Sequence, residues 1–469
     1  MLDFVGKNYH IVTYGCQMNV HESEKIAGIL ETMGMKRCED IKKSKVIVFN
    51  TCCIREGAED RAYSNIAALK KYKESNDDVI LVMCGCMPQQ KQGKYNLKEK
   101  LPYVDIIIGT HNINLLKEYL TRFTIERRRI FEVVEKPIST QVVSHTVRDD
   151  ENNAYVNIIY GCNKFCTYCI VPYVRGRERS RPYGEIVEEV KGLIAQGYKY
   201  ITLLGQNVNS YGKDLENGMD FAELLLRLSR LPGDFKLKFM TSHPIDFTSD
   251  IIEVMKDEPK VAKCLHLPVQ SGSDSVLKRM NRKYDSKQYM KIIKSAKKAM
   301  PNIALSTDII VGFPGETDKD FMATLKLARK VKYDQMFAFM YSKRTGTPAA
   351  TFTDQVPDEV KNQRLNKLLR EHKFITNEEN QKMKGKIFNC LLKIKNGLAY
   401  GLTDGGKEIF LPENSVLEEN VFANVKVEGI REHKLSGVII KWQNQNYLQE
   451  WDNITALKKS IKIVYCFIV

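Results

Sequence analysis

Six of the twelve cysteines fall into two groups of three, and this grouping limits the possible folds of the chain more than any other feature. One group is a tight CxxxCxxC cluster made of Cys162, Cys166 and Cys169. The other group is dispersed over the N-terminal part and consists of Cys16, Cys52 and Cys86. Three thiolates can bind three irons of a four-iron, four-sulfur cluster and leave the fourth iron open. A zinc site or a plain iron–sulfur site with a remote fourth cysteine is the less favoured alternative.

The tight cluster resembles the signature of radical S-adenosylmethionine (AdoMet) enzymes. An aromatic residue, Tyr168, stands directly before the third cysteine, as it does in that signature. Two short spacings let one loop surround one cluster, and the open iron can then chelate the amino and carboxylate groups of AdoMet. The resemblance implies that the cofactor supplies the radical chemistry while the protein positions and shields it, with Tyr168 among the cofactor-binding residues.

Each dispersed cysteine follows an apolar run that is typical of a buried strand. The runs, separated by helix-like stretches, span residues 9–14, 46–50 and 79–83. This alternation predicts a parallel α/β domain over residues 7–125. Because parallel strands end at one edge of a sheet, the three cysteines are expected to meet there and to hold a second cluster. Cys53, directly after Cys52, is an alternative ligand.

The middle of the chain predicts an incomplete parallel barrel of six strand–helix units, (β/α)6, over residues 148–377. A polar linker is expected over residues 126–147. The expected strands are residues 155–160, 200–204, 236–241, 264–268, 303–311 and 335–341. Catalytic residues of such barrels lie at the carboxyl ends of the strands, and the tight cysteine cluster follows the first strand.

Small and polar residues follow other strands of this predicted barrel. Gly205, Gln206 and Asn207 come after the second strand, where their backbone and amide groups can take the AdoMet amino group. Gly312 follows the fifth strand, in a bend that suits a nucleoside pressed against the backbone. Each turn alone is a weak signal, but their placement on one face of one barrel favours a cofactor site.

Four arginines alternate with other residues directly after the cysteine cluster. In an extended segment they share one face and can contact phosphate or the AdoMet carboxylate, with Arg179 as the cofactor-binding candidate. A solvated basic loop is the alternative. The four are Arg175, Arg177, Arg179 and Arg181. Two further candidates near strand ends, His243 and His266, are expected to be structural rather than catalytic.

Residues 378–442 predict a small antiparallel β-barrel of about five strands, a type often used to bind nucleic acids. A plain capping domain is the alternative. The net charge of +15 and the pI near 9.1 favour a polyanionic partner, most simply nucleic acid. No role is assigned to the tail, residues 443–469.

Twelve cysteines without a secretory signal indicate a reducing, cytoplasmic location. No apolar run reaches the roughly 18 residues of a membrane span, and a monomer is expected.

Long stretches of the sequence resemble the radical AdoMet methylthiotransferases, and most closely their MiaB type, which acts on tRNA adenosine. The resemblance reaches to Trp442 and implies methylthiotransferase, radical AdoMet and C-terminal TRAM RNA-binding domains. The matching runs are residues 14–19, 50–52, 54–56, 161–173, 175–181 and 204–211. The family usually has a small non-cysteine residue at the position of Cys53.

The resemblance implies an AdoMet cluster on the tight cysteine group and an auxiliary cluster on the dispersed group. One AdoMet donates a methyl group to a sulfur atom at the auxiliary cluster. A second AdoMet is cleaved to a 5′-deoxyadenosyl radical, which removes hydrogen from C2 of an N6-isopentenyladenine beside the tRNA anticodon. The methylthio group is then delivered to that carbon. The implied partners are the tRNA anticodon loop, a reducing electron donor and a sulfur donor.

Three other functions are alternatives. Two are sister methylthiolations, of threonylcarbamoyl-adenosine in tRNA or of a ribosomal-protein aspartate. The third is a non-enzymatic iron–sulfur module for RNA binding or redox sensing, which would not need the motifs at the barrel strand ends. The runs at residues 163–165 and 206–211 favour the isopentenyl substrate.

Overall fold

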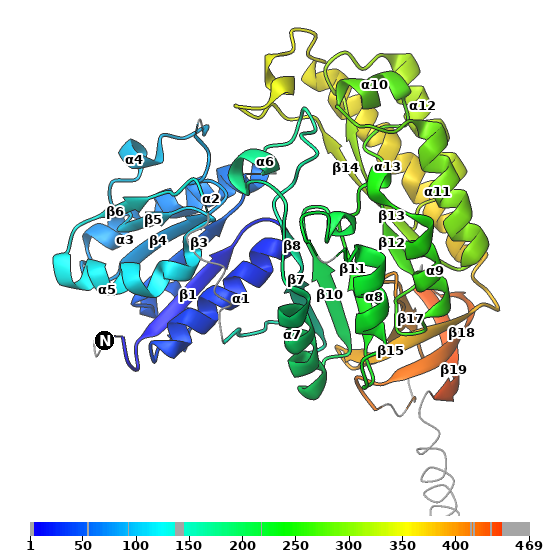
Figure 1. The fold of residues 1–469 in the computed structure, drawn as a ribbon, viewed down its shortest axis with the longest axis horizontal. Helices are drawn as coiled ribbons and strands as arrows, with labels where there is room; N and C mark the ends of the chain where they lie inside the picture. Colours follow the sequence, from blue (N-terminus) through cyan, green and yellow to red (C-terminus); the bar gives the residue numbers. More distant parts are fainter. Residues whose placement is uncertain are drawn as a thin grey trace, which may run out of the picture.

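The computed structural model describes residues 4–53, 56–91, 93–136, 145–216, 218–412, 415, 418–431 and 434–442. The predicted tail and residues 137–144 of the predicted linker lie outside the described residues. Figure 1 shows the N-terminal domain in blue and cyan on the left, the central barrel in green and yellow, and the C-terminal barrel in orange at the lower right.

The N-terminal domain is a six-stranded parallel sheet with the strand order β2-β1-β3-β4-β5-β6. Its strands are β1 (Asn8–Thr13), β2 (Lys36–Arg37), β3 (Val46–Thr51), β4 (Ile80–Gly85), β5 (Ile106–Ile108) and β6 (Ile130–Glu132). The main helices are α1 (Gln17–Thr32), α2 (Glu56–Ala68) and α5 (Leu116–Glu126). Alternate strand residues face opposite sides: Val46 and Val48 share a core with α1 and α5, and Ile47 and Phe49 share one with α2. The predicted parallel α/β domain is confirmed.

Two parts of the predicted linker belong to this domain. β6 pairs with β5 at the sheet edge, and its Ile130 is buried in the domain core. Further on, the Val147 amide donates to the Glu24 carbonyl oxygen on α1 at 3.1 Å. A three-residue strand is too short to produce a recognisable periodicity, which explains why the sequence pattern indicates only a linker here.

The central domain is the predicted incomplete barrel. Its six parallel strands are β7 (Asn153–Asn157), β10 (Tyr200–Leu204), β11 (Lys236–Phe239), β12 (Cys264–His266), β13 (Ala304–Val311) and β14 (Gln335–Met340). A parallel bridge between Leu237 and Val261 joins the β7-β10-β11 half to the β12-β13-β14 half. The outer helices are α7 (Tyr183–Ala195), α8 (Phe221–Ser229), α9 (Ser249–Asp257), α11 (Ser286–Ala299), α12 (Asp318–Val331) and α13 (Asp358–Gln381).

The C-terminal domain is a closed barrel with the strand order β15-β16-β17-β19-β18, as the glycine-punctuated alternation predicts. Its strands are β15 (Ile387–Lys395), β16 (Leu398–Leu402), β17 (Glu408–Phe410), β18 (Phe422–Arg431) and β19 (Lys434–Trp442). The barrel begins only after α13, which continues beyond the predicted domain boundary at residue 377.

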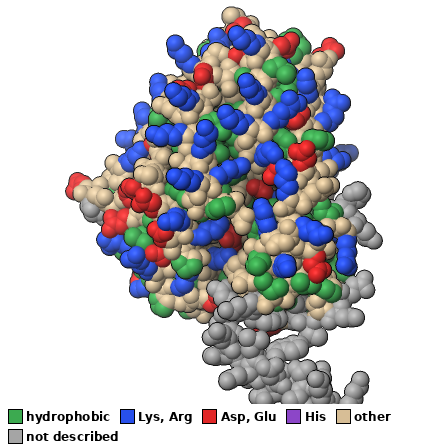
Figure 2. Space-filling model, turned by 90° about the vertical axis from the view of Figure 1, so that its right-hand side faces the viewer, with side chains coloured by type: hydrophobic (Ala, Val, Ile, Leu, Met, Phe, Trp, Pro, Cys, Tyr) green, Lys and Arg blue, Asp and Glu red, His purple; other side chains and the backbone are tan. Residues whose placement is uncertain are grey.

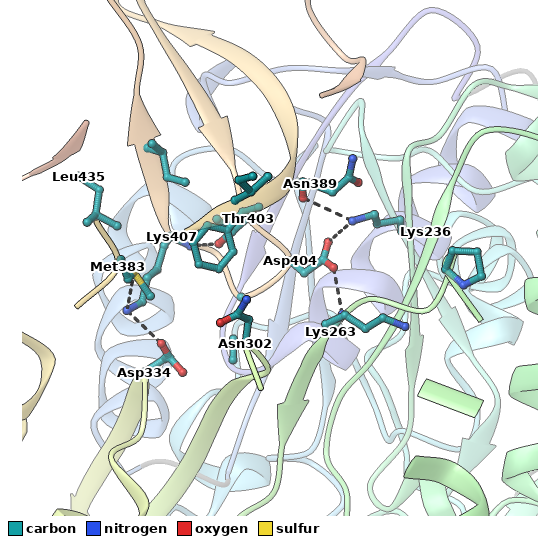
Figure 3. A pocket seen from close by; sticks show the side chains of 16 residues that line it. Lys236, Lys263, Asn302, Asp334, Met383, Asn389, Thr403, Asp404, Lys407 and Leu435 are labelled. Carbon is teal, nitrogen blue, oxygen red and sulfur yellow. Dashed lines mark hydrogen bonds and ion pairs between the residues drawn. The ribbon is translucent and has the colours of Figure 1, made fainter. Parts of the chain in front are cut away.

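The C-terminal barrel docks under the amino ends of the central strands. Asp404 accepts hydrogen bonds from Lys236 Nζ at 2.7 Å, from the Tyr200 hydroxyl at 3.1 Å and from the Lys263 amide at 3.0 Å. Lys407 pairs with Asp334 at 3.0 Å. These contacts surround a cavity of about 340 Å³, seen in Figure 3. The polar groups satisfy one another, and this end of a barrel usually serves stability.

Basic side chains cover much of the outer surface. Figure 2 views the right-hand side of Figure 1 and shows many Lys and Arg side chains there. Helix α11 contains no acidic residue. Its exposed lysines recur at helical spacing and are Lys287, Lys291, Lys294 and Lys298. Such a face complements a polyanion.

Candidate active site

The three dispersed cysteines lie at one edge of the N-terminal sheet. Cys16 follows β1 and caps α1, Cys52 follows β3, and Cys86 follows β4. Because β1, β3 and β4 are neighbours, their three loops meet at the carboxyl ends of adjacent strands. Gly15, at φ +121°, permits a close approach, since a side-chain carbon added there would lie 2.6 Å from Cys52 Cβ. The parallel topology thus brings the three loops together.

Asn19, in the first turn of α1, holds these loops in place. Its Nδ2 donates to the carbonyl oxygens of Tyr14 and Thr51 at 2.8 and 3.0 Å. Asn50 Nδ2 in turn donates to the Asn19 carbonyl oxygen at 2.9 Å. All four residues are buried, so water does not compete for these bonds.

Arg175, from the loop after the tight cluster, reaches into the dispersed cysteine site. Only 4% of the residue is exposed. Its Nη2 donates to the Cys86 sulfur at 3.4 Å and to Asn19 Oδ1 at 2.9 Å. Its Nη1 pairs with Glu22 at 2.6 Å. A buried guanidinium needs such partners, because an unpaired buried charge is strongly destabilising.

Cys53 also contacts this site. The residue is fully buried, and its thiol is hydrogen bonded to the Cys86 sulfur. This hydrogen bond, with a smaller contribution from the Arg175 charge, outweighs burial and lowers the pKa of Cys86 from 9.0 to about 7. A lower pKa favours the thiolate, which is the form that binds metal. The structure therefore makes Cys53 a neighbour of the third cysteine.

The tight cluster occupies the loop after β8 (Ile159–Tyr160). The Cys162 amide donates to the Gly176 carbonyl oxygen at 3.1 Å, and the Cys169 amide donates to that of Cys166 at 3.0 Å. These bonds hold the loop in a compact form. Burial raises the pKa of Cys162 to about 12, in contrast to the lowered pKa of Cys86 at the other site.

Arg282, after the short helix α10 (Asp274–Arg279), supports the tight cluster. Its Nη1 donates to the Cys166 sulfur at 3.4 Å, and its Nη2 donates to the Pro268 carbonyl oxygen at 2.9 Å. At each cysteine site, one buried arginine thus donates a hydrogen bond to one of the cysteine sulfurs. Sequence reasoning missed both contacts. Asn19 and Arg175 lie within recognisable motifs, but no local pattern singles out Arg282.

One dipeptide connects the two cysteine sites. Arg175 donates to the Cys86 sulfur, and the carbonyl oxygen of the next residue, Gly176, accepts from the Cys162 amide. Gly176 has φ +77°, a conformation that favours glycine. The two sites therefore share one short segment of backbone.

Both triads consist of cysteine thiols, the usual ligands of iron–sulfur clusters. In the part of the chain that the structure describes, no three His, Cys, Asp or Glu side chains are spaced to hold one metal ion. Thiolates on separate irons of a four-iron cube stand further apart than the ligands of one ion. Three cysteines at each site are the ligand number that a four-iron cluster with one open iron would take.

Residues after β10 present unsatisfied polar atoms at the carboxyl end of the barrel. Asn207 Nδ2 donates to Asp246 at 2.7 Å, while Gln206 Nε2 contacts the Met18 sulfur. Gly205 packs against Ile159, where a side-chain carbon would lie 2.4 Å from Cγ2. Four buried oxygens here have no hydrogen-bond partner among the described residues: Gln206 Oε1, Asn207 Oδ1, Ser242 Oγ and Tyr341 Oη. Buried acceptors of this kind fit a ligand that brings donors, such as an ammonium group.

Tyr168 lies beside the tight cluster, as its place in the motif predicts. It packs against the small core that contains Phe313 and Tyr341. Burial raises its pKa, as do the neighbouring Cys166 and Cys169, while Arg282 opposes the rise. The ring therefore helps to shield the cluster loop from water.

Two other predicted cofactor residues have structural roles in the fold. The Gly312 amide donates to Glu316 at 2.9 Å, and a side-chain carbon at Gly312 would lie 2.3 Å from Lys361 Cγ on α13. Glycine is required there for packing against α13. Arg179 lies in the short strand β9 (Arg179–Ser180), and its burial lowers its pKa.

The arginine run is not one extended face, and that prediction is wrong. Arg175 ends the short helix α6 (Val171–Val174), and Gly176 then turns the chain. Arg181 is buried and pairs with Glu189 at 2.7 Å. The Arg177 guanidinium lies 4.4 Å from the Phe165 ring centroid. The turn at Gly176 separates Arg175 from the three later arginines, of which Arg179 lies in β9.

The two histidines have structural partners, as expected. His243 Nδ1 accepts from the Ile245 amide at 3.3 Å, and burial lowers the His243 pKa to about 2. His266 Nδ1 lies 2.9 Å from the Ser306 hydroxyl. Each Nδ1 is thus held by a neighbouring residue.

Comparisons with known proteins match this architecture. Residues 156–328 match the radical SAM superfamily, and residues 8–109 match the uncharacterized protein family UPF0004. The chain is 48% identical to the tRNA-2-methylthio-N(6)-dimethylallyladenosine synthase of Clostridium botulinum strain Langeland, over 92% of this chain and 96% of that protein. The synthase of Caldicellulosiruptor saccharolyticus is 44% identical over 92% and 93% of the two chains.

The chain belongs to the tRNA-2-methylthio-N(6)-dimethylallyladenosine synthase family. Members of this family are radical AdoMet methylthiotransferases, so the predicted family and enzyme class are confirmed.

Solved structures resemble this family member in fold alone. The radical AdoMet methyltransferase TsrM from Kitasatospora setae aligns with a TM-score of 0.54 at 12% identity, over 74% of this chain and 75% of that chain. The cobalamin-dependent enzyme OxsB aligns with a TM-score of 0.50 at 12% identity, over 80% and 57%. Both show a fold shared over most of this chain. None of the helices in the described residues is long and apolar enough to cross a membrane.

Proposed function

We propose that this chain methylthiolates C2 of N6-isopentenyladenosine, also called N6-dimethylallyladenosine, next to the tRNA anticodon. The observation that carries the proposal is the pair of cysteine triads linked through Arg175 and Gly176, in a chain nearly half identical to synthases of that product. The C2–H of adenine is not acidic, so acid–base catalysis alone cannot remove this hydrogen.

Two four-iron clusters and AdoMet are the proposed cofactors. Cys162, Cys166 and Cys169 would hold the cluster that binds AdoMet. The auxiliary cluster would be held by Cys16, Cys52 and Cys86. When bound, an open-iron cluster with AdoMet supplies the one-electron chemistry that an aromatic C–H requires.

The remaining residues would bind and orient these groups. Arg282 and Arg175 each hold one cysteine sulfur in place by a charge-assisted hydrogen bond. Gln206 Oε1 and Asn207 Oδ1 would accept from the AdoMet ammonium group, and the bond from Asn207 to Asp246 would fix the amide orientation. Tyr168 would exclude water from the cluster loop.

The proposed macromolecular partner is the tRNA anticodon loop. The net charge of +15, the lysines of α11 and the C-terminal barrel support an electrostatic contribution to binding. A single-stranded loop base can leave its stack to reach a buried site at low cost. A cytoplasmic location, a monomeric state, an electron donor and a sulfur donor complete the proposal.

Mass spectrometry of tRNA nucleosides tests this function. A strain lacking its own synthase receives either this chain or its Cys166→Ala variant as a matched control. We expect 2-methylthio-N6-dimethylallyladenosine with the unchanged chain and only the unmethylthiolated nucleoside with the variant. Accumulation of a methylthiolated threonylcarbamoyl-adenosine instead would show that the chain has the sister activity.

A further inference from the structure

The incomplete barrel of the central domain is open on one side, between its first strand β7 and its last strand β14. The start of α1 faces this opening and leaves a cleft of about 540 Å³. Clefts of roughly 300–1,000 Å³ hold small ligands in proteins. One wall comes from the N-terminal domain and the other from the barrel: Cys16, Gln17 and Val20 face Tyr155, Phe337 and Phe339.

The β14 wall of the cleft is apolar. Phe337 is 42% exposed, which is unusual for a large apolar side chain inside a barrel opening. Its ring lies 6.0 Å from that of His266 in an edge-on arrangement, and the Ser306 hydroxyl fixes His266 at 2.9 Å. Among the described residues that line the cleft, none is Lys, Arg, Asp or Glu. A preorganised, uncharged, aromatic wall suits a hydrocarbon group.

The substituents of the modified adenine fit this geometry. C2 and N6 lie on different sides of the six-membered ring. If C2 faces the dispersed cysteine site, which includes Cys16, the N6 substituent, attached meta to C2, diverges from it, and β14 forms the other wall of the same cleft. We propose that Phe337 and its β14 neighbours form the subsite for the five-carbon dimethylallyl group. This inference rests on the proposed function and extends it to substrate recognition.

The same wall explains discrimination against the sister substrate. A threonylcarbamoyl group carries a carboxylate, which needs a cation or several donors when it leaves water. No Lys or Arg is among the described residues that line the cleft. Asp308, in register with Phe337 on β13, is acidic and lies 3.6 Å from His266 Nε2, so it offers a carboxylate no cation. The subsite therefore selects the hydrocarbon by apolar contact and rejects the acid by electrostatics.

Binding to three synthetic anticodon stem–loop RNAs tests the subsite. They carry adenosine, N6-dimethylallyladenosine or threonylcarbamoyl-adenosine at the target position, and Kd is measured anaerobically with the reconstituted full chain. We expect the dimethylallyl RNA to bind at least about tenfold tighter than the unmodified RNA, the discrimination that one methylene already provides in an apolar pocket. Phe337→Ala and Phe337→Gln should reduce this ratio to near one, while Phe337→Leu should keep most of it.

Phe374→Ala is the matched control, because Phe374 is 62% exposed on α13 and does not line the cleft. It should keep the full ratio, and affinity for unmodified RNA should be the same in all variants. An undiminished ratio in Phe337→Ala, an equal loss in Phe374→Ala, or preference of the unchanged chain for the threonylcarbamoyl RNA overturns the subsite. If the unchanged chain forms no methylthio product on the dimethylallyl RNA, the proposed function itself fails; if it does, only the subsite is in question.

Discussion

The tight and the dispersed cysteine sites differ in how much of the fold each needs. Hydrogen bonds within one short segment shape the loop of Cys162 to Cys169, whereas Cys16, Cys52 and Cys86 meet only because three parallel strands are neighbours. Their surroundings differ as well. Burial raises the pKa of Cys162, while Cys53 and Arg175 lower that of Cys86. Both sites need distant segments, but in different ways: the tight loop is anchored by contacts of Cys166 with Arg282 and of Thr167 with Met280, whereas the dispersed site depends on every strand that forms it.

The sharpest separation of the two sites comes from single cysteine changes. Cys166→Ala should abolish reductive cleavage of AdoMet, since the open iron is lost with its cluster. Cys86→Ala should leave that cleavage detectable but abolish methylthiolation, since no auxiliary cluster then carries sulfur. Measuring 5′-deoxyadenosine and methylthio-adenosine side by side checks both. Normal methylthiolation in Cys86→Ala would contradict the ligand assignment.

Substitutions at the two buried arginines should also separate the two cysteine sites, with smaller effects than the cysteine changes. Removal of a charge-assisted hydrogen bond costs about 1.5–3 kcal/mol, which corresponds to a loss of roughly tenfold or more. Arg282→Met should lower 5′-deoxyadenosine formation, and Arg175→Met should lower methylthiolation with less effect on cleavage. Lys at either position should restore part of the loss. Equal effects of both Met variants on both products would show that the sites are not separable.

Iron content should report two sites per chain. Anaerobic reconstitution should yield about eight irons, four for each triad. Changing Cys162, Cys166 and Cys169 together to Ala should halve this value, because the proposed ligands of the dispersed site follow β1, β3 and β4 and are left unchanged. A single cluster in the unchanged chain, or bound zinc, contradicts the two-site model.

The smallest effect is expected at Cys53. Cys53→Ala removes one hydrogen bond to the Cys86 sulfur but no proposed ligand, so product formation should remain near that of the unchanged chain. Cys52→Ala is the matched comparison and should be inactive. An inactive Cys53→Ala beside an active Cys52→Ala would show that Cys53, and not Cys52, is the ligand.

Much of the architecture could be predicted from local patterns. The six barrel strands and the strands before the dispersed cysteines lie within a few residues of their predicted positions, because buried parallel strands read as continuous apolar runs. Strand β6, with only three residues, escaped the same reasoning. The prediction for the arginine run is wrong because alternation in sequence indicates a shared face only if the segment is extended, and the turn at Gly176 interrupts it after Arg175.

The sequence by itself determined the family, the two cysteine groups and the order of the three domains, since these depend on residue type and short spacings. Only the tertiary structure decided which arginine serves which site. Arg175 lies 89 residues from Cys86, and Arg282 lies 116 residues from Cys166. It also decided that an uncharged aromatic strand edge faces Cys16 across the barrel opening. Contacts between distant segments follow from how the whole chain packs, and no local pattern of residues encodes them.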